Sequence, residues 1–304
     1  MAKWTAANIP SQRGRSVVVT GAGGLGFEDA LALARAGAEV IVAGRNPTKG
    51  NAAVAAIKRL VPGASVGFEV LDLASLQSVA AFGQRLSDTR DHLDVLINNA
   101  GVMTPPTRRA TADGFELQFG TNYLGHFALT AHLLPLLRKG RTPRVITLSS
   151  IAARDGTIDF DDLQAERGYK AMPVYSQSKL ACLMFAFELQ RRSAAGGWGV
   201  ASIAAHPGIS RTELLPNGAG QRSAIGLARR VLWFLFQPAA QGALPTLFAA
   251  TSPDAKGGGY YGPNKMSETR GDPAVAKVPA RAKDTGAATR LWMVSEQLTG
   301  LTFG

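Results

Sequence analysis

Hydrophobic residues along the chain gather in short, continuous runs that alternate with longer stretches of helical periodicity. Apolar and β-branched runs predict buried strands, which we place at residues 16–20, 39–43, 66–71, 93–97, 144–148 and 200–204. Helical periodicity predicts helices near residues 25–36, 47–60, 75–86 and 112–137, and a further helix that contains Tyr175. Strands that are apolar on both faces and separated by helices are typical of a parallel sheet covered on both sides. The pattern therefore predicts an α/β fold with a doubly wound parallel sheet, a Rossmann fold.

No repeat, low-complexity tract or linker divides the sequence, so we predict a single domain over residues 1–304. Within this domain, residues 211–258 are richer in glycine, proline and aromatic residues. We interpret them as a small lobe or lid that covers the substrate. The aromatic side chains of Trp233, Phe234 and Phe236 in this lobe favour a lipophilic substrate.

The apolar segment 231–236 follows Arg229 and Arg230, so an alternative role for it is peripheral contact with a membrane surface. No window of the sequence reaches the roughly 18 apolar residues of a membrane-spanning helix. The N-terminal residues lack the apolar core of a signal peptide, and the single cysteine excludes a disulfide framework. These features predict a cytoplasmic protein.

The chain is basic, with 33 Lys and Arg against 22 Asp and Glu and a formal net charge of +11. The cations occur as scattered pairs without interleaved aromatic residues, which does not favour nucleic acid as a partner. Three Asp residues within 159–162 lack the spacing of a calcium loop, and the four His are widely separated. His126 and His132, on a helical stretch, are better explained by packing than by metal ligation. We therefore predict no metal site and no nucleic-acid partner.

A glycine-rich stretch follows the first predicted strand and opens the first helix. It reads Thr20-Gly-Ala-Gly-Gly-Leu-Gly26 and holds Gly21, Gly23 and Gly26 in G-x-G-x-x-G spacing, with Gly24 and Leu25 between them. Such glycines allow a tight turn and let a pyrophosphate approach the free N–H groups of the helix. The stretch predicts a dinucleotide-binding site.

The second predicted strand ends near Arg45, where a site for NAD often has an acid that binds the ribose 2′-hydroxyl. A carboxylate there would repel a 2′-phosphate, whereas a guanidinium binds one with paired hydrogen bonds. We therefore expect NADP(H) to be preferred over NAD(H); the alternative is a surface arginine in a loop. No basic residue lies between Gly21 and Gly26, so this expectation depends on Arg45.

Tyr175 and Lys179 are four positions apart and project from one face of a helix. A cation held beside a phenol favours the phenolate, which lets the tyrosine donate and accept a proton near neutral pH. Alone this spacing is common on solvated helix faces. Its weight comes from the other motifs of the chain.

Together the motifs resemble the short-chain dehydrogenase/reductase family, and most of all its retinol dehydrogenase-like branch. The resemblance extends over nearly the whole chain. It rests on the glycine loop, Leu71-Asp72-Leu73, Asn98-Asn-Ala-Gly101, Phe119-Gly-Thr-Asn-Tyr-Leu-Gly-His126, Ser149-Ser150, Tyr175 and Lys179, His206-Pro-Gly208 with Thr212, Gly259-Tyr-Tyr-Gly-Pro263 and the tail 291–298.

The resemblance implies a role for each matched residue. Asn122, Ser150, Tyr175 and Lys179 would form the catalytic set: Asn122 holds a helix kink and a water that relays protons, Ser150 binds the substrate oxygen, Tyr175 transfers the proton and Lys179 holds the nicotinamide ribose. The remaining residues would contact the cofactor: Asp72 and Leu73 at the adenine, Asn99, Ala100 and Gly101 at the adenosine ribose, and Pro207, Gly208 and Thr212 at the nicotinamide and pyrophosphate. The glycine loop is one residue shorter than the usual Thr-Gly-x-x-x-Gly-x-Gly pattern, which changes the expected pyrophosphate geometry.

The helix that carries Tyr175 is apolar nearly all round from Leu180 to Leu189. Such a helix must be buried on both sides, so we expect one side to meet the sheet and the other to form a homodimer. Cys182 is then a small buried hydrophobe and not a nucleophile.

These interpretations combine into an NADP(H)-dependent oxidoreductase that interconverts a carbonyl and an alcohol on a lipophilic small molecule, with Tyr175 as general acid and base. Two alternatives stay open: a reductase of an activated C=C bond, and an NADP(H)-binding sensor without turnover. The complete set of Asn122, Ser150, Tyr175 and Lys179 disfavours the sensor, because a pure binder has no need of a polarised phenol.

Overall fold

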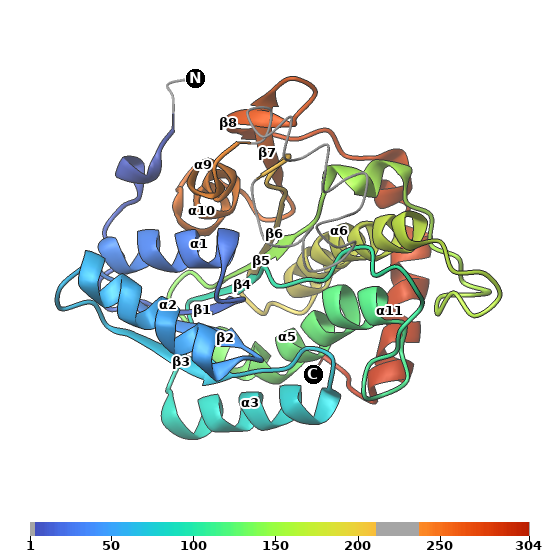
Figure 1. Ribbon diagram of the computed structural model, residues 1–304, viewed down its shortest axis with the longest axis horizontal. Helices are drawn as coiled ribbons and strands as arrows, with labels where there is room; N and C mark the ends of the chain where they lie inside the picture. Colours follow the sequence, from blue (N-terminus) through green and yellow to red (C-terminus); the bar gives the residue numbers. More distant parts are fainter. Residues whose placement is uncertain (1–3, 211–236, 304) are drawn as a thin grey trace.

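A twisted eight-stranded sheet forms the centre of the molecule (Figure 1), in a computed structural model that describes residues 4–210 and 237–303. The strand order is β3-β2-β1-β4-β5-β6-β7-β8. Neighbouring strands from β3 to β7 run parallel, and β8 is antiparallel to β7. The strands are β1 (Ser16–Thr20), β2 (Glu39–Gly44), β3 (Val66–Val70), β4 (Val95–Asn98), β5 (Arg144–Leu148), β6 (Ala201–Ala205), β7 (Tyr260–Lys265) and β8 (Arg270–Val275). The predicted doubly wound Rossmann sheet is confirmed.

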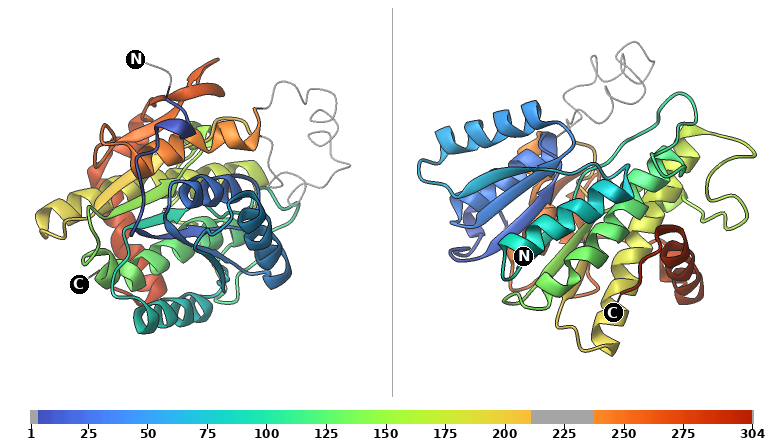
Figure 2. Two further views of the ribbon diagram at one scale, coloured as in Figure 1. Left: turned by 90° about the vertical axis from the view of Figure 1, so that its left-hand side faces the viewer. Right: turned by 90° about the horizontal axis from the view of Figure 1, so that it is seen from below.

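Helices cover both faces of this sheet (Figure 2). The α-helices are α1 (Gly24–Arg35), α2 (Pro47–Leu60), α3 (Leu76–Thr89), α4 (Leu117–Phe119), α5 (Gly125–Leu137), α6 (Ala171–Ala195), α9 (Ala239–Gly242), α10 (Leu244–Thr251) and α11 (Thr285–Thr299). A π-helical turn, η2 (Gly120–Leu124), joins α4 to α5, and short 3-10 helices are η1 (Ala6–Asn8), η3 (Ile151–Asp155) and η5 (Ala280–Lys283). Val17 and Val19 pack with α1, α2 and α10, whereas Val18 packs with α3, α5, α6 and α11. Alternate strand residues thus supply two cores, one on each face.

Helix α6 is buried along most of its length, as its apolar sequence predicts. The C-terminal helix α11 covers the side that faces away from the sheet. Its Trp292 lies against Phe185 of α6 and Phe127 of α5, with ring centroids 5.8 and 5.0 Å apart. Because α11 of the same chain provides this cover, the apolar helix no longer supports a homodimer, and the oligomeric state stays a prediction.

Strands β7 and β8 were not expected from the hydrophobic pattern. Both contain proline, and Pro263 of β7 lies opposite Pro273 of β8. Proline cannot donate to a strand ladder, so it is confined to edges and irregular pairs and obscures the strand signal. The long helix predicted near 112–137 begins at Leu117 and changes to a π turn before α5.

The predicted lobe at residues 211–258 divides into two parts. Residues 211–236, with Trp233, Phe234 and Phe236, lie outside the described residues, so the lid stays a prediction. Residues 237–258 contain α9 and α10, and α10 packs on β5, β6 and β7 as part of the sheet cover. Among the helices of the described part, none is long and apolar enough to cross a membrane.

Candidate active site

A cavity of about 540 Å³ lies at the carboxyl ends of β1 to β4, where the strand order reverses direction. Ligands of open α/β sheets bind at this kind of reversal. The predicted cofactor residues that line it are Gly21, Gly23, Gly24, Arg45, Asp72, Leu73, Ala100 and Gly101. The sequence analysis missed other lining residues, among them Phe27, Glu28, Asn46, Lys49, Val102, Thr121 and Ala239. The cavity therefore gathers four stretches that follow β1, β2, β3 and β4, together with Thr121 and Ala239, into one candidate dinucleotide site.

The shortened glycine loop still forms the turn from β1 into α1. Gly21 has a φ of +95° and Gly24 a φ of +53°, values that favour glycine. A Cβ on Gly26 would stand 2.2 Å from the Gly21 carbonyl oxygen, so helix and loop touch through their backbones. A Cβ on Gly23 would meet nothing within 4 Å. No side chain of the described residues caps α1, which leaves its first N–H groups available to an anion at the cavity.

Thr20, at the end of β1, holds the loop after β4 beside the glycine loop. Its hydroxyl oxygen accepts the backbone N–H groups of Asn99 and Ala100, both at 2.9 Å. Asn99 returns a bond from its side-chain Nδ2 to the Thr20 carbonyl at 2.7 Å. The predicted ribose-binding residues Asn99 and Ala100 are thus fixed next to the glycine loop, and Gly101 follows them in the chain.

Arg45 and Lys49 place two cations at the end of the cavity that follows β2. Asn46 connects them, because its side chain caps α2 by accepting the Lys49 backbone N–H at 3.0 Å. Lys49 was missed in the sequence analysis; its signal was its position in the first turn of a helix that begins beside Arg45. The Arg45 side chain is exposed, as a group that meets a ligand phosphate must be.

Asn122 lies in the π-helical turn η2, an irregularity that often marks functional positions. Its side-chain Oδ1 accepts the Val102 N–H at 2.7 Å, and its Nδ2 donates to the Val102 carbonyl and to Ser178 Oγ, both at 3.0 Å. Ser178 in turn donates to the Tyr175 carbonyl oxygen at 2.7 Å. Asn122 therefore joins the loop after β4 to the helix that carries Tyr175 and Lys179. Ser178, which the sequence analysis missed, is the link.

Lys179 reaches from α6 to the end of β5, where its Nζ donates to the Leu148 carbonyl at 3.0 Å. Ser149 closes the same junction by donating to the Lys179 carbonyl at 2.8 Å. A Cβ built on Gly101 would lie 3.0 Å from Asn122 Oδ1 and 3.7 Å from Lys179 Nζ. The ammonium group and the Asn122 amide therefore meet at the glycine that borders the cavity.

Ser150 and Tyr175 lie on adjoining segments. Ser150 follows β5 and caps η3, accepting the Ala152 N–H at its Oγ at 3.2 Å. The end of η3 packs closely on α6, since a Cβ on Gly156 would stand 2.5 Å from the Ser176 carbonyl oxygen. Tyr175 is buried, with 4% of its surface exposed. The elements that carry the four predicted catalytic residues, η2, α6 and η3 with its cap Ser150, thus pack against one another.

His126 is a buried residue that forms a hydrogen bond with the Asn122 backbone carbonyl. It is 2% exposed, and burial is the main reason that its pKa falls to about 4. The ring is therefore neutral near pH 7: Nδ1–H donates to the Asn122 carbonyl at 2.9 Å, and Nε2 accepts the Thr20 hydroxyl at 3.0 Å. The expectation that packing explains this histidine is confirmed, and no cluster of metal-ligating side chains is found in the described ranges.

Cys182 contacts the same carbonyl group of Asn122 through its Sγ, at 3.2 Å. Burial raises the pKa of this thiol, and its side chain is 1% exposed. The prediction that Cys182 is a small buried residue is confirmed.

Pro207 and Gly208 follow β6 and lie against the β7–β8 hairpin. Gly208 has a φ of +63°, and a Cβ there would stand 2.3 Å from the Thr269 carbonyl oxygen. The side chain of Gln237 donates to the Pro207 carbonyl at 2.6 Å. Thr212, the last of the predicted cofactor residues, lies outside the described residues.

Comparison of the whole sequence with known proteins identifies the family of this chain. A family model for short chain dehydrogenases matches residues 15–222. This chain belongs to the short-chain dehydrogenase family. Among its relatives, polyprenol dehydrogenase of Mus musculus is 40% identical over 299 residues, which cover 96% of this chain and 86% of that protein. Human retinol dehydrogenase 13 is 40% identical over 302 residues, covering 97% of this chain and 86% of that protein.

Solved structures share the fold of this chain. An uncharacterised protein from Mycobacterium Paratuberculosis superposes with a TM-score of 0.82 at 42% identity, and all of both chains is covered. A short chain dehydrogenase from Shigella flexneri, solved with NADP, shares the fold with a TM-score of 0.65 at 22% identity over 83% of this chain. The predicted retinol dehydrogenase-like branch is confirmed, and the protein is an oxidoreductase.

Proposed function

We propose that this short-chain dehydrogenase uses NADP(H) to interconvert a carbonyl and an alcohol on a lipophilic substrate, with Tyr175 as the proton-transferring residue. The observation that carries the proposal is the Asn122–Ser178–Tyr175 connection, which joins the dinucleotide cavity to the helix of Tyr175 and Lys179. The connection ends at the Tyr175 backbone carbonyl oxygen, so it fixes the helix that presents Tyr175 and Lys179 relative to the loop at Val102, which lines the cavity.

The residues of the cavity fit a dinucleotide. The N-terminus of α1, beside Gly23, would hold the pyrophosphate, and the loop at Asn99 and Ala100 would hold the adenosine ribose. When bound, the nicotinamide supplies a hydride to the carbonyl carbon or accepts one from the alcohol. Side chains of the protein bind the substrate oxygen and transfer the proton.

Carbonyl reduction builds negative charge on the substrate oxygen, so donors must face that atom. In the proposal, the Ser150 hydroxyl donates to the oxygen, and the Tyr175 hydroxyl delivers its proton there. Lys179 is a positive charge one helical turn from Tyr175, and it favours the phenolate that remains after the transfer. We also propose that a water molecule held at Asn122 relays a further proton. In alcohol oxidation, Tyr175 accepts the proton instead.

Preference for NADP(H) rests on Arg45 and Lys49, two cations that line the cavity after β2. Two carboxylates, Glu28 and Asp72, also line the cavity, but neither follows β2. A 2′-phosphate at this end of the cavity would meet cations without a competing acid from the same loop.

The proposed lipophilic substrate is supported by relatives whose names are polyprenol dehydrogenase and retinol dehydrogenase 13. Both names are those of dehydrogenases, one of polyprenol and one of retinol. Among residues 4–210 and 237–303, no observation favours reduction of a C=C bond, and the names of the relatives favour alcohol chemistry, so carbonyl and alcohol chemistry is the function that we propose.

The first test measures NADPH consumption over aldehydes and ketones of increasing chain length for the wild type and for Tyr175→Phe. We expect turnover that increases with chain length and falls by about 10²-fold or more in the variant, the lower end of what a positioned acid contributes. NADPH binding, measured by fluorescence titration, should stay within threefold. Equal rates in the two proteins would remove Tyr175 from the mechanism.

The second test measures cofactor affinity in Arg45→Ala, beside Arg59→Ala as a matched control from the exposed part of α2. We expect Arg45→Ala to weaken NADPH binding at least tenfold while NADH binding changes less than twofold, because loss of a charge-assisted hydrogen bond costs about 1.5–3 kcal/mol. Equal weakening for both cofactors would refute the assignment of Arg45 to the 2′-phosphate.

A further inference from the structure

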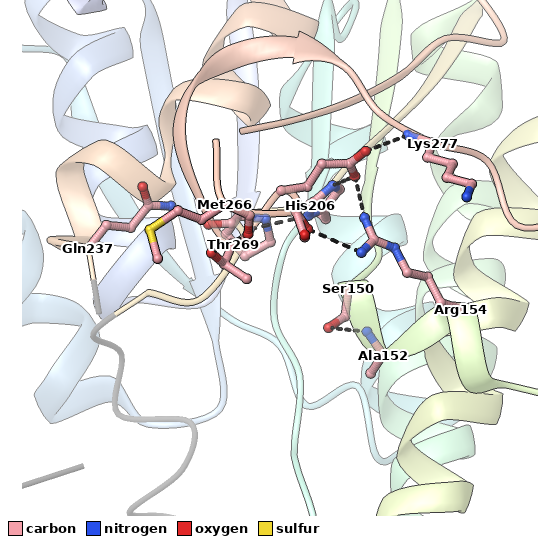
Figure 3. A network of polar contacts seen from close by, with 12 residues as sticks. Ser150, Ala152, Arg154, His206, Gln237, Met266, Thr269 and Lys277 are labelled. Atoms are coloured by element: carbon pink, nitrogen blue, oxygen red, sulfur yellow. Dashed lines mark hydrogen bonds and ion pairs between the residues drawn. The ribbon is translucent and has the colours of Figure 1, made fainter. Parts of the chain in front are cut away.

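A carboxylate of the β7–β8 hairpin meets two segments of the candidate active site. Glu268 accepts a hydrogen bond from Arg154 at 2.6 Å and lies 3.1 Å from His206 Nε2, both at its Oε2. Its other oxygen, Oε1, accepts the Lys277 backbone N–H at 2.9 Å. Figure 3 shows Arg154, His206 and Lys277 gathered at this point, with Ser150 and Ala152 beside Arg154.

Each partner of Glu268 belongs to a segment with an assigned position in the site. His206 is fully buried and directly precedes Pro207 and Gly208, the predicted nicotinamide loop. Arg154 lies in η3, the helix that Ser150 caps. One carboxylate thus connects the segment of the substrate-binding serine with the loop proposed to flank the nicotinamide.

The hairpin also holds this loop through its backbone. Ile209 donates to the Thr269 carbonyl at 2.7 Å, and Gly208 can approach that carbonyl because it lacks a Cβ. Before Thr269, the residues Met266, Ser267 and Glu268 have φ values of 49°, 56° and 68°. Three successive non-glycine residues in the left-handed region are unfavourable, and such conformations persist where surrounding contacts enforce them. Here that conformation directs Glu268 towards His206 and Arg154.

The environment keeps Glu268 ionised. Burial acts to raise its pKa, but the hydrogen bonds from His206 and the Lys277 N–H, with the positive charge of Arg154, outweigh burial and lower the pKa to about 2. Its side chain is 19% exposed and borders a cavity of about 470 Å³ that Arg154 and Lys277 also line. Replacement by the isosteric glutamine therefore fits without a clash and removes the charge.

We infer that Glu268 is a positioning residue for hydride transfer, which fixes the distance between the Ser150 segment and the Pro207–Gly208 loop through Arg154 and His206. The inference rests on the proposed function, because it assigns the two segments to substrate and nicotinamide. Glu268 acts through other residues, so its loss should slow the chemical step more than it weakens binding of the cofactor.

The test compares wild type, Glu268→Gln and a control, Asp272→Asn. Asp272 lies in the same hairpin, paired with Lys265 at 3.7 Å, away from the His206 cluster. In Glu268→Gln we expect kcat to fall at least tenfold, the KM for NADPH to change less than threefold, and the isotope effect on kcat with NADPH deuterated at the transferred hydrogen to rise. The control should keep wild-type values. Arg154→Gln should lower kcat as well, and the double variant should lose less than the product of the single effects.

Hydrogen exchange measured by mass spectrometry provides a readout that does not need turnover. In Glu268→Gln, exchange in residues 151–156 and 206–210 should be faster than in wild type and in Asp272→Asn. A kcat within twofold of wild type, or an unchanged isotope effect and unchanged exchange, would overturn the inference. Wild-type protein that binds NADPH but turns over no carbonyl or alcohol would instead refute the proposed function, and the exchange result would then show separately whether Glu268 connects the two segments.

Discussion

Replacement of Thr20 by valine should show how strongly one hydroxyl group stabilises the cofactor cradle. Valine has nearly the shape of threonine, but it removes the acceptor of the Asn99 and Ala100 N–H groups and the partner of His126 Nε2. Each N–H donor left without a partner costs about 1–3 kcal/mol. Because Asn99 and Ala100 are partly exposed, we take the lower end of this range for each of their N–H groups. The extra methyl group returns about 1 kcal/mol. We expect a net loss of roughly 2–3 kcal/mol in the free energy of unfolding.

Urea unfolding of the cofactor-free protein measures this loss, with Thr20→Ser as the matched control. Serine keeps the hydroxyl and removes one buried methyl group, which should cost about 1 kcal/mol. NADPH affinity should fall in the valine variant and stay near wild type in the serine variant, since the loop at Asn99 and Ala100 borders the cavity. Equal destabilisation by the two substitutions would show that the methyl group, and not the hydrogen bonds, stabilises the junction.

Three further predictions concern buried groups near the site. Gly26→Ala should destabilise the protein and weaken NADPH binding at least tenfold, because the added Cβ would overlap the Gly21 carbonyl oxygen at 2.2 Å. Gly23→Ala is the control: a Cβ at Gly23 has no atom within 4 Å, so this variant should keep wild-type thermal stability. Loss of stability in both variants would contradict this geometry. Asp29 is fully buried, and its carboxylate has no hydrogen-bond partner in the described part of the chain. Burial raises the pKa of this carboxyl group, so above about pH 4 the group ionises in the unfolded state before it does in the folded state, and the protein becomes less stable as pH rises. Asp29→Asn should therefore be more stable than wild type at pH 7 in urea titrations, and no gain would indicate a partner for the carboxylate. Because the pKa of His126 is lowered to about 4 in the folded protein, the unfolded state binds a proton at a higher pH than the folded state does. The free energy of unfolding should therefore decrease by about 3 kcal/mol as pH falls from 6.5 to 4. His126→Gln should show a smaller decrease, measured as the difference in free energy of unfolding between wild type and variant.

Much of the site follows from local sequence because its chemistry depends on short-range geometry. The glycine spacing from Gly21 to Gly26 requires a tight strand-to-helix turn wherever it occurs, and the positions of Tyr175 and Lys179 place both on one helix face. Arg45 follows a strand that the apolar run at residues 39–43 predicts. These features needed no knowledge of distant contacts, and the structure places the glycine loop and Arg45 at the cavity.

Other features depend on contacts between residues far apart in the sequence. Lys49 reaches the cavity because Asn46 caps α2, and Ser178 matters because η2 places Asn122 opposite it. The apolar sequence of α6 suggested a partner subunit, but α11 of the same chain covers this helix. A sequence shows that a helix face must be covered but not which element covers it.

The sequence by itself determined the parallel sheet and the glycine-rich turn from β1 into α1, because periodicity and spacing act within a few residues of the backbone. The roles proposed for Ser150, Tyr175 and Lys179 come from the family resemblance and stay a prediction. Tertiary structure alone decided that β7 and β8 extend the sheet despite their prolines, and that Glu268 lies against His206, 62 positions away in the chain. Such pairings arise when the whole core is packed, because burial selects them from many alternatives that the local sequence leaves equally favourable.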